Sequence, residues 1–141
     1  MSVSEILSGK GGNVITVSPE TTLEDVAGIL AKHKIGALVV KDGSDVCGIV
    51  SERDVVRQIA SDGEGALQHT VGQCMTKAVI SSTRADSIDT VMEKMTTGRF
   101  RHLPVIEDGE LLGIISIGDV VKRKIEQAER DAEELKRYIA S

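Results

Sequence analysis

The 141-residue sequence is almost devoid of aromatic residues and has few cysteines. Phe100 and Tyr138 are its only aromatic residues and tryptophan is absent, so its core must be built from Val, Ile, Leu, Ala and Met. Cys47 and Cys74 lack the paired spacing of a zinc or redox motif, and no metal ligand set is predicted. Cys47 lies in an apolar stretch that is typical of a buried thiol. We therefore expect the reducing environment of the cytoplasm.

Basic residues and long apolar runs are also scarce. Seventeen Lys and Arg stand against twenty-two Asp and Glu, which gives a net charge of −5. Broad nucleic-acid binding needs a basic face, so nucleic acid is an unfavoured partner. The sequence contains no apolar run long enough to cross a bilayer, and it contains no signal-peptide pattern. We therefore expect no membrane association. It also lacks a nucleophile–base pair and carboxylates at active-site spacing, so no catalytic residue is predicted and we expect no enzyme.

What the sequence does contain is an internal repeat. Residues 14–59 align with residues 79–124 without a gap, and eleven positions are identical. Both copies predict the same order of strand, helix, strand, strand and helix, which indicates an internal duplication. The predicted domains are a first repeat over residues 1–65, a second over 66–125, and a C-terminal helical extension over 126–141.

Apolar periodicity and capping residues predict the elements of each repeat. The predicted strands cover residues 14–17, 35–40, 46–50, 79–81, 103–106 and 111–115. The predicted helices open at Thr21, Ser51, Asp86 and Asp119, with short helical turns over 3–8 and 71–75. Glycine-rich residues 9–12 and 61–65 are predicted to be loops. Neither repeat can bury a core alone, so we expect an α/β (α+β) fold whose two sheets pack together.

Each repeat carries a serine followed three residues later by an aspartate: Ser51 and Asp54, and Ser116 and Asp119. This spacing puts both side chains at the first turn of a helix, where unpaired N–H groups and the helix dipole attract an anion. A carboxylate there can accept two hydrogen bonds from a vicinal diol such as a ribose. The same spacing is also that of a capping box, in which the side chains only satisfy the helix end.

The C-terminal helix is predicted to be longer than its counterpart in the first repeat. Over residues 122–140 its apolar residues form a stripe: Ile125, Ala128, Ala132, Leu135 and Ile139. Such a stripe fits either a face packed on the rest of the chain or a contact with a second subunit.

The two Gly-Ile-Val/Ile-Ser-x-x-Asp segments, with residues 35–40, 71–75 and 100–105, resemble the CBS domain (cystathionine-beta-synthase domain). The pattern is similar to a tandem pair, or Bateman module, of the stand-alone bacterial type, and covers residues 3 to about 125. The resemblance implies two β-α-β-β-α units related by a pseudo-two-fold axis, with an extended C-terminal helix. It implies a non-enzymatic adenine-nucleotide sensor that forms a homodimer and acts on an unknown target protein. AMP is the first expectation for the ligand, with ATP, ADP, NAD or S-adenosylmethionine as alternatives, and no cofactor is required. A structural dimerisation module without a ligand is the competing hypothesis.

The resemblance also implies two ligand clefts that each mix the two repeats. In the first cleft, the residues implied to bind are Ser116, Asp119, Ile15, Ile35, Gly36, Ala37, Ile114, Arg101 and His102, the last two facing the phosphate. In the second cleft they are Ser51, Asp54, Ile80, Phe100 and Arg53. Gly36 and Ala37 stand in the second cleft at the positions matching Arg101 and His102, so we expect stronger phosphate binding in the first. A histidine beside a strand, such as His102, is more often structural than ligand-binding. Lys10 is a further candidate, although its glycine loop lacks the spacing of a Walker motif.

Overall fold

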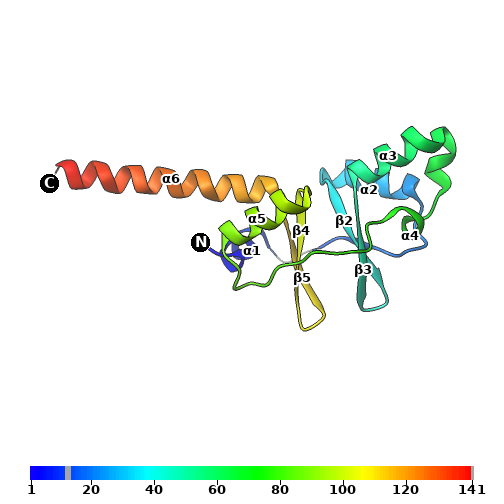
Figure 1. Cartoon of the computed structure of the whole chain (residues 1–141), viewed down its shortest axis with the longest axis horizontal. Coiled ribbons are helices and arrows are strands. Elements are labelled where there is room, and N and C mark those ends of the chain that lie inside the picture. Colours follow the sequence, from blue (N-terminus) through cyan, green and yellow to red (C-terminus); the bar gives the residue numbers. More distant parts are fainter. Residues whose placement is uncertain (12–13, 141) are drawn as a thin grey trace.

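The computed structural model describes residues 1–11 and 14–140 of the chain (Figure 1). Gly12, in the predicted first loop, and Ser141, in the predicted extension, lie outside the described residues. The elements in chain order are α1 (Val3–Lys10), β1 (Thr16–Val17), α2 (Leu23–His33), β2 (Ala37–Asp42), β3 (Asp45–Ser51), α3 (Glu52–Asp62), the 3-10 helix η1 (Gly63–Gln68), α4 (Val71–Cys74), α5 (Ile88–Gly98), β4 (His102–Glu107), β5 (Glu110–Ser116) and α6 (Ile117–Ala140). The predicted α/β class is confirmed.

The two repeats build matching hairpins. In the first, β1 pairs parallel with β2 and β2 antiparallel with β3, whereas the second sheet contains β4 and β5 in antiparallel pairing. Each hairpin has a register shift at the equivalent place, between Val40 and Lys41 and between Val105 and Ile106. The hairpins stand side by side in Figure 1, so their upper ends, where α3 and α6 begin, lie near each other.

The short helices α1 and α4 are exchanged between the repeats. Val3 and Ile6 of α1 are buried in the core of the second repeat, whereas Val71 of α4 is buried in the core of the first. Two matching glycines admit these helices, because a Cβ at Gly113 would lie 2.5 Å from Leu7 Cδ2 and one at Gly48 would lie 2.5 Å from Met75 Sδ. The second hairpin is thus covered by α1, which precedes the first repeat in the chain. The first hairpin is covered by α4, which follows the first repeat.

Three predicted segments differ from the structure. Residues 9 and 10 are not in a loop, because α1 continues to Lys10. Residues 61–65 are not a flexible connector but form the end of α3 and the start of η1, where the fully buried Ala66 anchors the chain. Residues 79–81 do not form a strand. Only Ser82 bridges to Val105, and Ile80 stays 46% exposed because it borders a cavity.

Helix starts and the first strand also shift. The strand predicted over 14–17 is confined to Thr16–Val17. Thr22 rather than Thr21 caps α2, and Ser87 rather than Asp86 caps α5, each through its side-chain oxygen. Asp86 instead accepts hydrogen bonds from Thr83 and pairs with Lys94 at 3.3 Å. The last helix begins at Ile117, two residues before Asp119.

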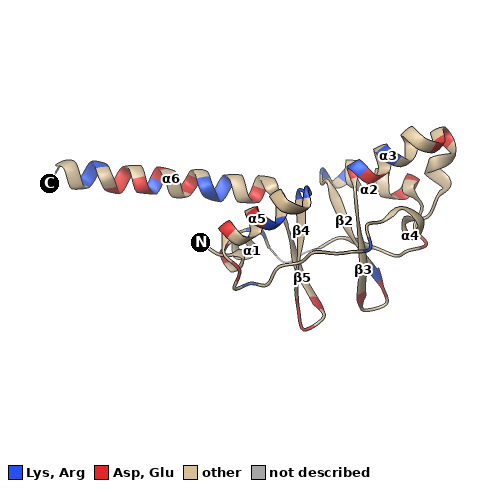
Figure 2. Ribbon diagram, viewed as in Figure 1, with Lys and Arg blue, Asp and Glu red and all other residues tan. Residues whose placement is uncertain are grey.

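Helix α6 extends well past the rest of the molecule (Figure 1). Every described residue from Ala128 to its end is exposed, and Ile125, Leu135 and Ile139 are 54%, 59% and 75% exposed. In the described chain the predicted stripe therefore does not pack against the body of the protein. Figure 2 shows acidic and basic residues following one another along this helix. No helix of the described residues has the length and apolarity to cross a membrane.

Candidate functional site

Both Ser-x-x-Asp motifs form helix caps. The N–H of Ser51 donates to Asp54 Oδ2 at 2.9 Å, and the N–H of Asp54 donates to Ser51 Oγ at 3.4 Å. The matching distances between Ser116 and Asp119 are 2.8 and 3.2 Å. The capping-box interpretation is confirmed, but these bonds use only Oδ2 of each carboxylate. Capping therefore leaves Oδ1 of both aspartates able to accept hydrogen bonds from a ligand.

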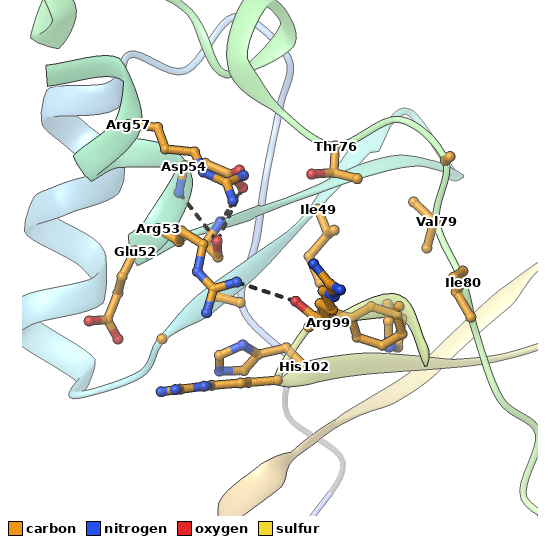
Figure 3. A pocket seen from close by; sticks show the side chains of 18 residues that line it. Ile49, Glu52, Arg53, Asp54, Arg57, Thr76, Val79, Ile80, Arg99 and His102 are labelled. Carbon is orange, nitrogen blue, oxygen red and sulfur yellow. Dashed lines mark hydrogen bonds between the residues drawn. The ribbon is translucent and has the colours of Figure 1, made fainter. Parts of the chain in front are cut away.

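One cavity, which we call the Asp54 cleft, lies beside the first motif and has a volume of about 620 Å³. Its polar lining comprises Ser51, Glu52, Arg53, Asp54, Arg57, Thr76, Arg99, Arg101 and His102, and its apolar lining includes Ile49, Val79, Ile80 and Phe100. Figure 3 shows Asp54, Arg53 and Arg57 on one side and Arg99 and Ile80 on the other. Four arginines against two carboxylates give this cleft an excess of positive charge.

Arg53 joins the two repeats across the Asp54 cleft. Its Nη1 donates to the backbone carbonyl of Arg99 at 3.2 Å. Arg99 ends α5 with a left-handed backbone, φ 56°. Lys34 ends α2 at the equivalent position with φ 54° and lines the other cavity. Left-handed backbone is uncommon for residues other than glycine, and such strain gathers at functional sites. Both repeats therefore place a cation at the edge of a cleft in the same unusual way.

The second cavity, the Asp119 cleft, has a volume of about 830 Å³. Lys10 Nζ lies 2.7 Å from Asp119 Oδ2 and donates at 2.7 Å to the carbonyl oxygen of Ile114. Burial alone would raise the pKa of Asp119, but the hydrogen bond from Lys10 and those from Ser116 lower this pKa below its usual value. Asp119 is therefore an ionised carboxylate that already has a cationic partner.

Gly36 and His102 separate the two clefts, because both residues line both cavities, as do Glu52 and Arg101. A Cβ at Gly36 would lie 2.8 Å from His102 Nε2 and 2.8 Å from Glu52 Oε1, so a larger residue there would have to displace both side chains. Burial is the main cause that lowers the pKa of His102, which keeps the imidazole neutral at pH 7. Arg101 and His102 were predicted to serve the first cleft alone. The structure places both side chains on the walls of both cavities, so they give no reason for weaker phosphate binding in the second cleft.

Most of the predicted site residues do come together. The Asp119 cleft gathers Lys10, Ile35, Gly36, Arg101, His102, Ile114, Ser116 and Asp119. The Asp54 cleft gathers Ser51, Arg53, Asp54, Ile80 and Phe100, together with Gly36 and Ala37, which were expected there as well. Ala37 is not in the lining of the Asp119 cleft, where it was also expected. Ile15 is not among the described residues that line either cavity. It packs instead against the core of the first repeat.

Sequence reasoning missed Glu52, Arg57 and Arg99 as cleft residues. Arg57 could have been found, because it follows Arg53 by four residues in a helix and so lies on the same face. Arg99 carries no such local signal, since its place depends on the cap of α5. Within residues 1–11 and 14–140, the structure contains no cluster of three or more side chains that could hold a metal ion.

Comparison with known proteins gives consistent matches along the chain. The sequence model of the CBS domain matches twice, at residues 3–61 and 71–126. The mitochondrial CBS domain-containing protein CBSX3 of Arabidopsis thaliana is 33% identical over 97% of this chain and 71% of its own length.

Two solved structures share the fold. The CBS-domain protein ATU1752 from Agrobacterium tumefaciens is 48% identical, with a TM-score of 0.86 over 88% of this chain and 99% of that chain. The CBS domain pair of protein MJ0100, solved in complex with 5′-methylthioadenosine and S-adenosyl-L-methionine, is 25% identical, with a TM-score of 0.80 over 90% of this chain and 98% of that one.

Proposed function

Since this chain belongs to the CBS-domain family and contains two copies of the domain, we propose that it is a regulatory module that binds an adenine nucleotide in its clefts. Members of the family are generally regulatory rather than catalytic. The proposed ligand is AMP, with ADP, ATP or NAD as alternatives. Binding would favour one arrangement of the two repeats, because Arg53 and His102 bring groups of both repeats to the cleft walls, and a partner protein would detect that arrangement.

The observation that carries this proposal is the lining of the Asp54 cleft. Oδ1 of Asp54 can accept hydrogen bonds from the two hydroxyls of a ribose, while Oδ2 accepts the hydrogen bond of the helix cap. Ile49, Val79 and Ile80 offer an apolar surface for a base on the opposite wall (Figure 3). Arginine binds phosphate through a planar fork of donors. A nucleoside with a phosphate tail therefore suits this cleft in both chemistry and charge.

The charge of the lining favours a phosphate over a sulfonium group. MJ0100 was solved with a neutral thioether and a cationic sulfonium of adenosine. In the present chain four arginines face two carboxylates at the Asp54 cleft, whereas Lys10, Lys34 and Arg101 face Glu52 and Asp119 at the other. We accordingly expect the Asp54 cleft to bind phosphorylated nucleotides more tightly than the Asp119 cleft, the reverse of the order that the sequence predicted.

Isothermal titration with adenosine, AMP, ATP, NAD and S-adenosylmethionine tests the proposal. Asp54→Ala removes hydrogen bonds to a charged acceptor, so it should weaken AMP binding by roughly 10- to 150-fold. Asp119→Ala should weaken it less, and Asp45→Ala, at an exposed residue that begins β3, should leave it unchanged. If none of these ligands binds or shifts the thermal transition of the parent protein, the nucleotide proposal fails, and a structural dimerisation module becomes the better hypothesis.

A further inference from the structure

We propose that α6 forms a parallel two-stranded coiled coil with α6 of a second copy of this chain. Six apolar residues carry the proposal, and we call them the α6 seam: Val121, Ile125, Ala128, Ala132, Leu135 and Ile139. Their spacings are alternately four and three residues, so they occupy successive a and d positions of a heptad repeat and lie on one face of the helix.

The seam has no cover within the described chain. Val121 is 49% exposed, Ile125 54%, Leu135 59% and Ile139 75%. At 1.5 Å per residue, the 24 residues of α6 span about 36 Å, and the later half projects beyond the body in Figure 1. Exposed single apolar residues are ordinary, but a continuous heptad stripe of this length along a projecting helix indicates a partner helix.

The body of the protein leaves room for that partner. Val120 is 1% exposed and marks the face of α6 that packs on the second repeat. Because successive residues of a helix are turned by about 100°, the seam beginning at Val121 lies roughly a quarter turn away from that face. Two copies related by a two-fold axis along the coil would therefore hold their bodies on opposite sides of it.

Charge beside the seam selects a second copy in parallel orientation. In the heptad that places Ile125, Ala132 and Ile139 at position a, Lys124 and Asp131 occupy g, and Glu129 and Lys136 occupy the following e positions. A parallel pair thus places Lys124 beside Glu129 of the partner subunit, and Asp131 beside Lys136 of the partner subunit. Both contacts join opposite charges, as coiled coils use to choose partner and orientation.

An antiparallel pair would bring like charges together. It would set Glu129 against Glu129 of the partner subunit, Asp131 against Asp131 of the partner subunit, and Lys122 against Lys136 of the partner subunit. Lys124 already binds Asp89 at 2.6 Å, so in the parallel pair its ammonium group would be shared between Asp89 and Glu129 of the partner subunit. The contact of Asp131 with Lys136 of the partner subunit therefore contributes more to the orientation. Isoleucine at two of the three a positions and leucine at one d position also fit a parallel pair of strands.

Light scattering and sedimentation of the full chain test the proposal. The parent should sediment as a dimer of twice its 15.0 kDa mass and dissociate on dilution, because the seam is short and two of its layers are alanine. The double variant Leu135→Lys, Ile139→Lys should be monomeric with unchanged circular dichroism of the body, since both side chains are exposed. Glu134→Lys, which lies off the seam, is the matched control and should stay dimeric. A monomeric parent, or a dimer that survives the double variant, would overturn the proposal.

Two further variants test the orientation. Lys136→Glu should raise the dissociation constant of a parallel dimer roughly fourfold or more, because both copies of the contact with Asp131 become repulsive. In an antiparallel dimer the same change would set a negative charge against Lys122 of the partner subunit and tighten the dimer, an outcome that refutes our orientation. Ala132→Cys should form a disulfide-linked dimer on mild oxidation, since position a meets position a across a parallel pair. The parent, which retains Cys47 and Cys74, should not do so under the same conditions.

Discussion

Replacing Lys10 by methionine should change adenosine and AMP binding at the Asp119 cleft in opposite directions. Lys10 Nζ lies 2.7 Å from Asp119 Oδ2, and the two side chains are 36% and 22% exposed. An ion pair of such exposure is worth about 1 kcal/mol, the upper end of the range for surface pairs. Lys10 pairs with Oδ2 and so offsets the negative charge that Oδ1 presents to a ribose. The substitution restores that charge, so adenosine should bind up to roughly fivefold more tightly.

AMP should respond differently, because the ammonium group that leaves Asp119 can turn to the phosphate. A hydrogen bond to a charged group contributes about 1.5–3 kcal/mol. After subtraction of the gain at Asp119, Lys10→Met should weaken AMP by about 0.5–2 kcal/mol, or roughly 2- to 30-fold. The methionine retains most of the apolar stem of lysine, so the packing of α1 is disturbed little.

The assay is calorimetric titration in an Asp54→Ala background, which leaves the Asp119 cleft to report on binding. Lys32→Met, an exposed lysine of α2, is the control and should change neither affinity. If Lys10→Met weakens adenosine as much as AMP, then Lys10 holds the shape of the cleft and does not act by offsetting the charge of Asp119. If neither affinity changes, the contact between Lys10 and Asp119 has no part in binding.

Three further outcomes are expected. Gly48→Ala should lower the free energy of unfolding, measured by urea titration, by about 1–3 kcal/mol, because its Cβ would meet Met75 Sδ at 2.5 Å and a backbone oxygen at 3.0 Å. Gly113→Ala should lower it less, because its Cβ would meet only the flexible side chain of Leu7. Equal losses for the two variants would contradict this reasoning. The parent should lose stability as pH falls below about 6.5, because burial lowers the pKa of His102 in the folded chain and the unfolded chain then binds the proton more readily than the folded one. The loss should be smaller in His102→Gln. An unchanged dependence of stability on pH in this variant would show that His102 is not its cause. Arg101→Ala should weaken AMP but not adenosine, with Arg101→Lys intermediate, whereas equal weakening of both ligands would give Arg101 a purely structural role.

Local patterns in the sequence were enough to predict the hairpins and the helix caps on which the clefts depend. The spacing of Ser51 and Asp54 places a carboxylate on the first turn of α3 whatever surrounds it, and the structure has that geometry. The two short helices could be predicted from the sequence, but not their exchange between repeats. Gly113 and Leu7 are distant in the chain, and no periodicity connects them.

The charge of the clefts was harder to predict than their position. Aligning the repeats gives each residue an equivalent, but it does not reveal that Arg101 lies on a wall common to both cavities. Lys10 could be proposed as a ligand residue, although its salt bridge to Asp119 depends on α1 packing against β5. Such contacts join distant parts of the chain, and composition and spacing contain no information about them.

The exchange of α1 and α4 has a consequence for synthesis on the ribosome. Helix α1 is translated before the other described elements, yet the strand that receives Leu7 at Gly113 is translated more than a hundred residues later. Until then Val3 and Ile6, which are fully or almost fully buried in the finished protein, have no native surface to cover. The first repeat can close as soon as α4 emerges, whereas the N-terminus must wait for the second hairpin. We expect the nascent chain to pass through a stage with one half folded and an apolar N-terminal helix still exposed to chaperones.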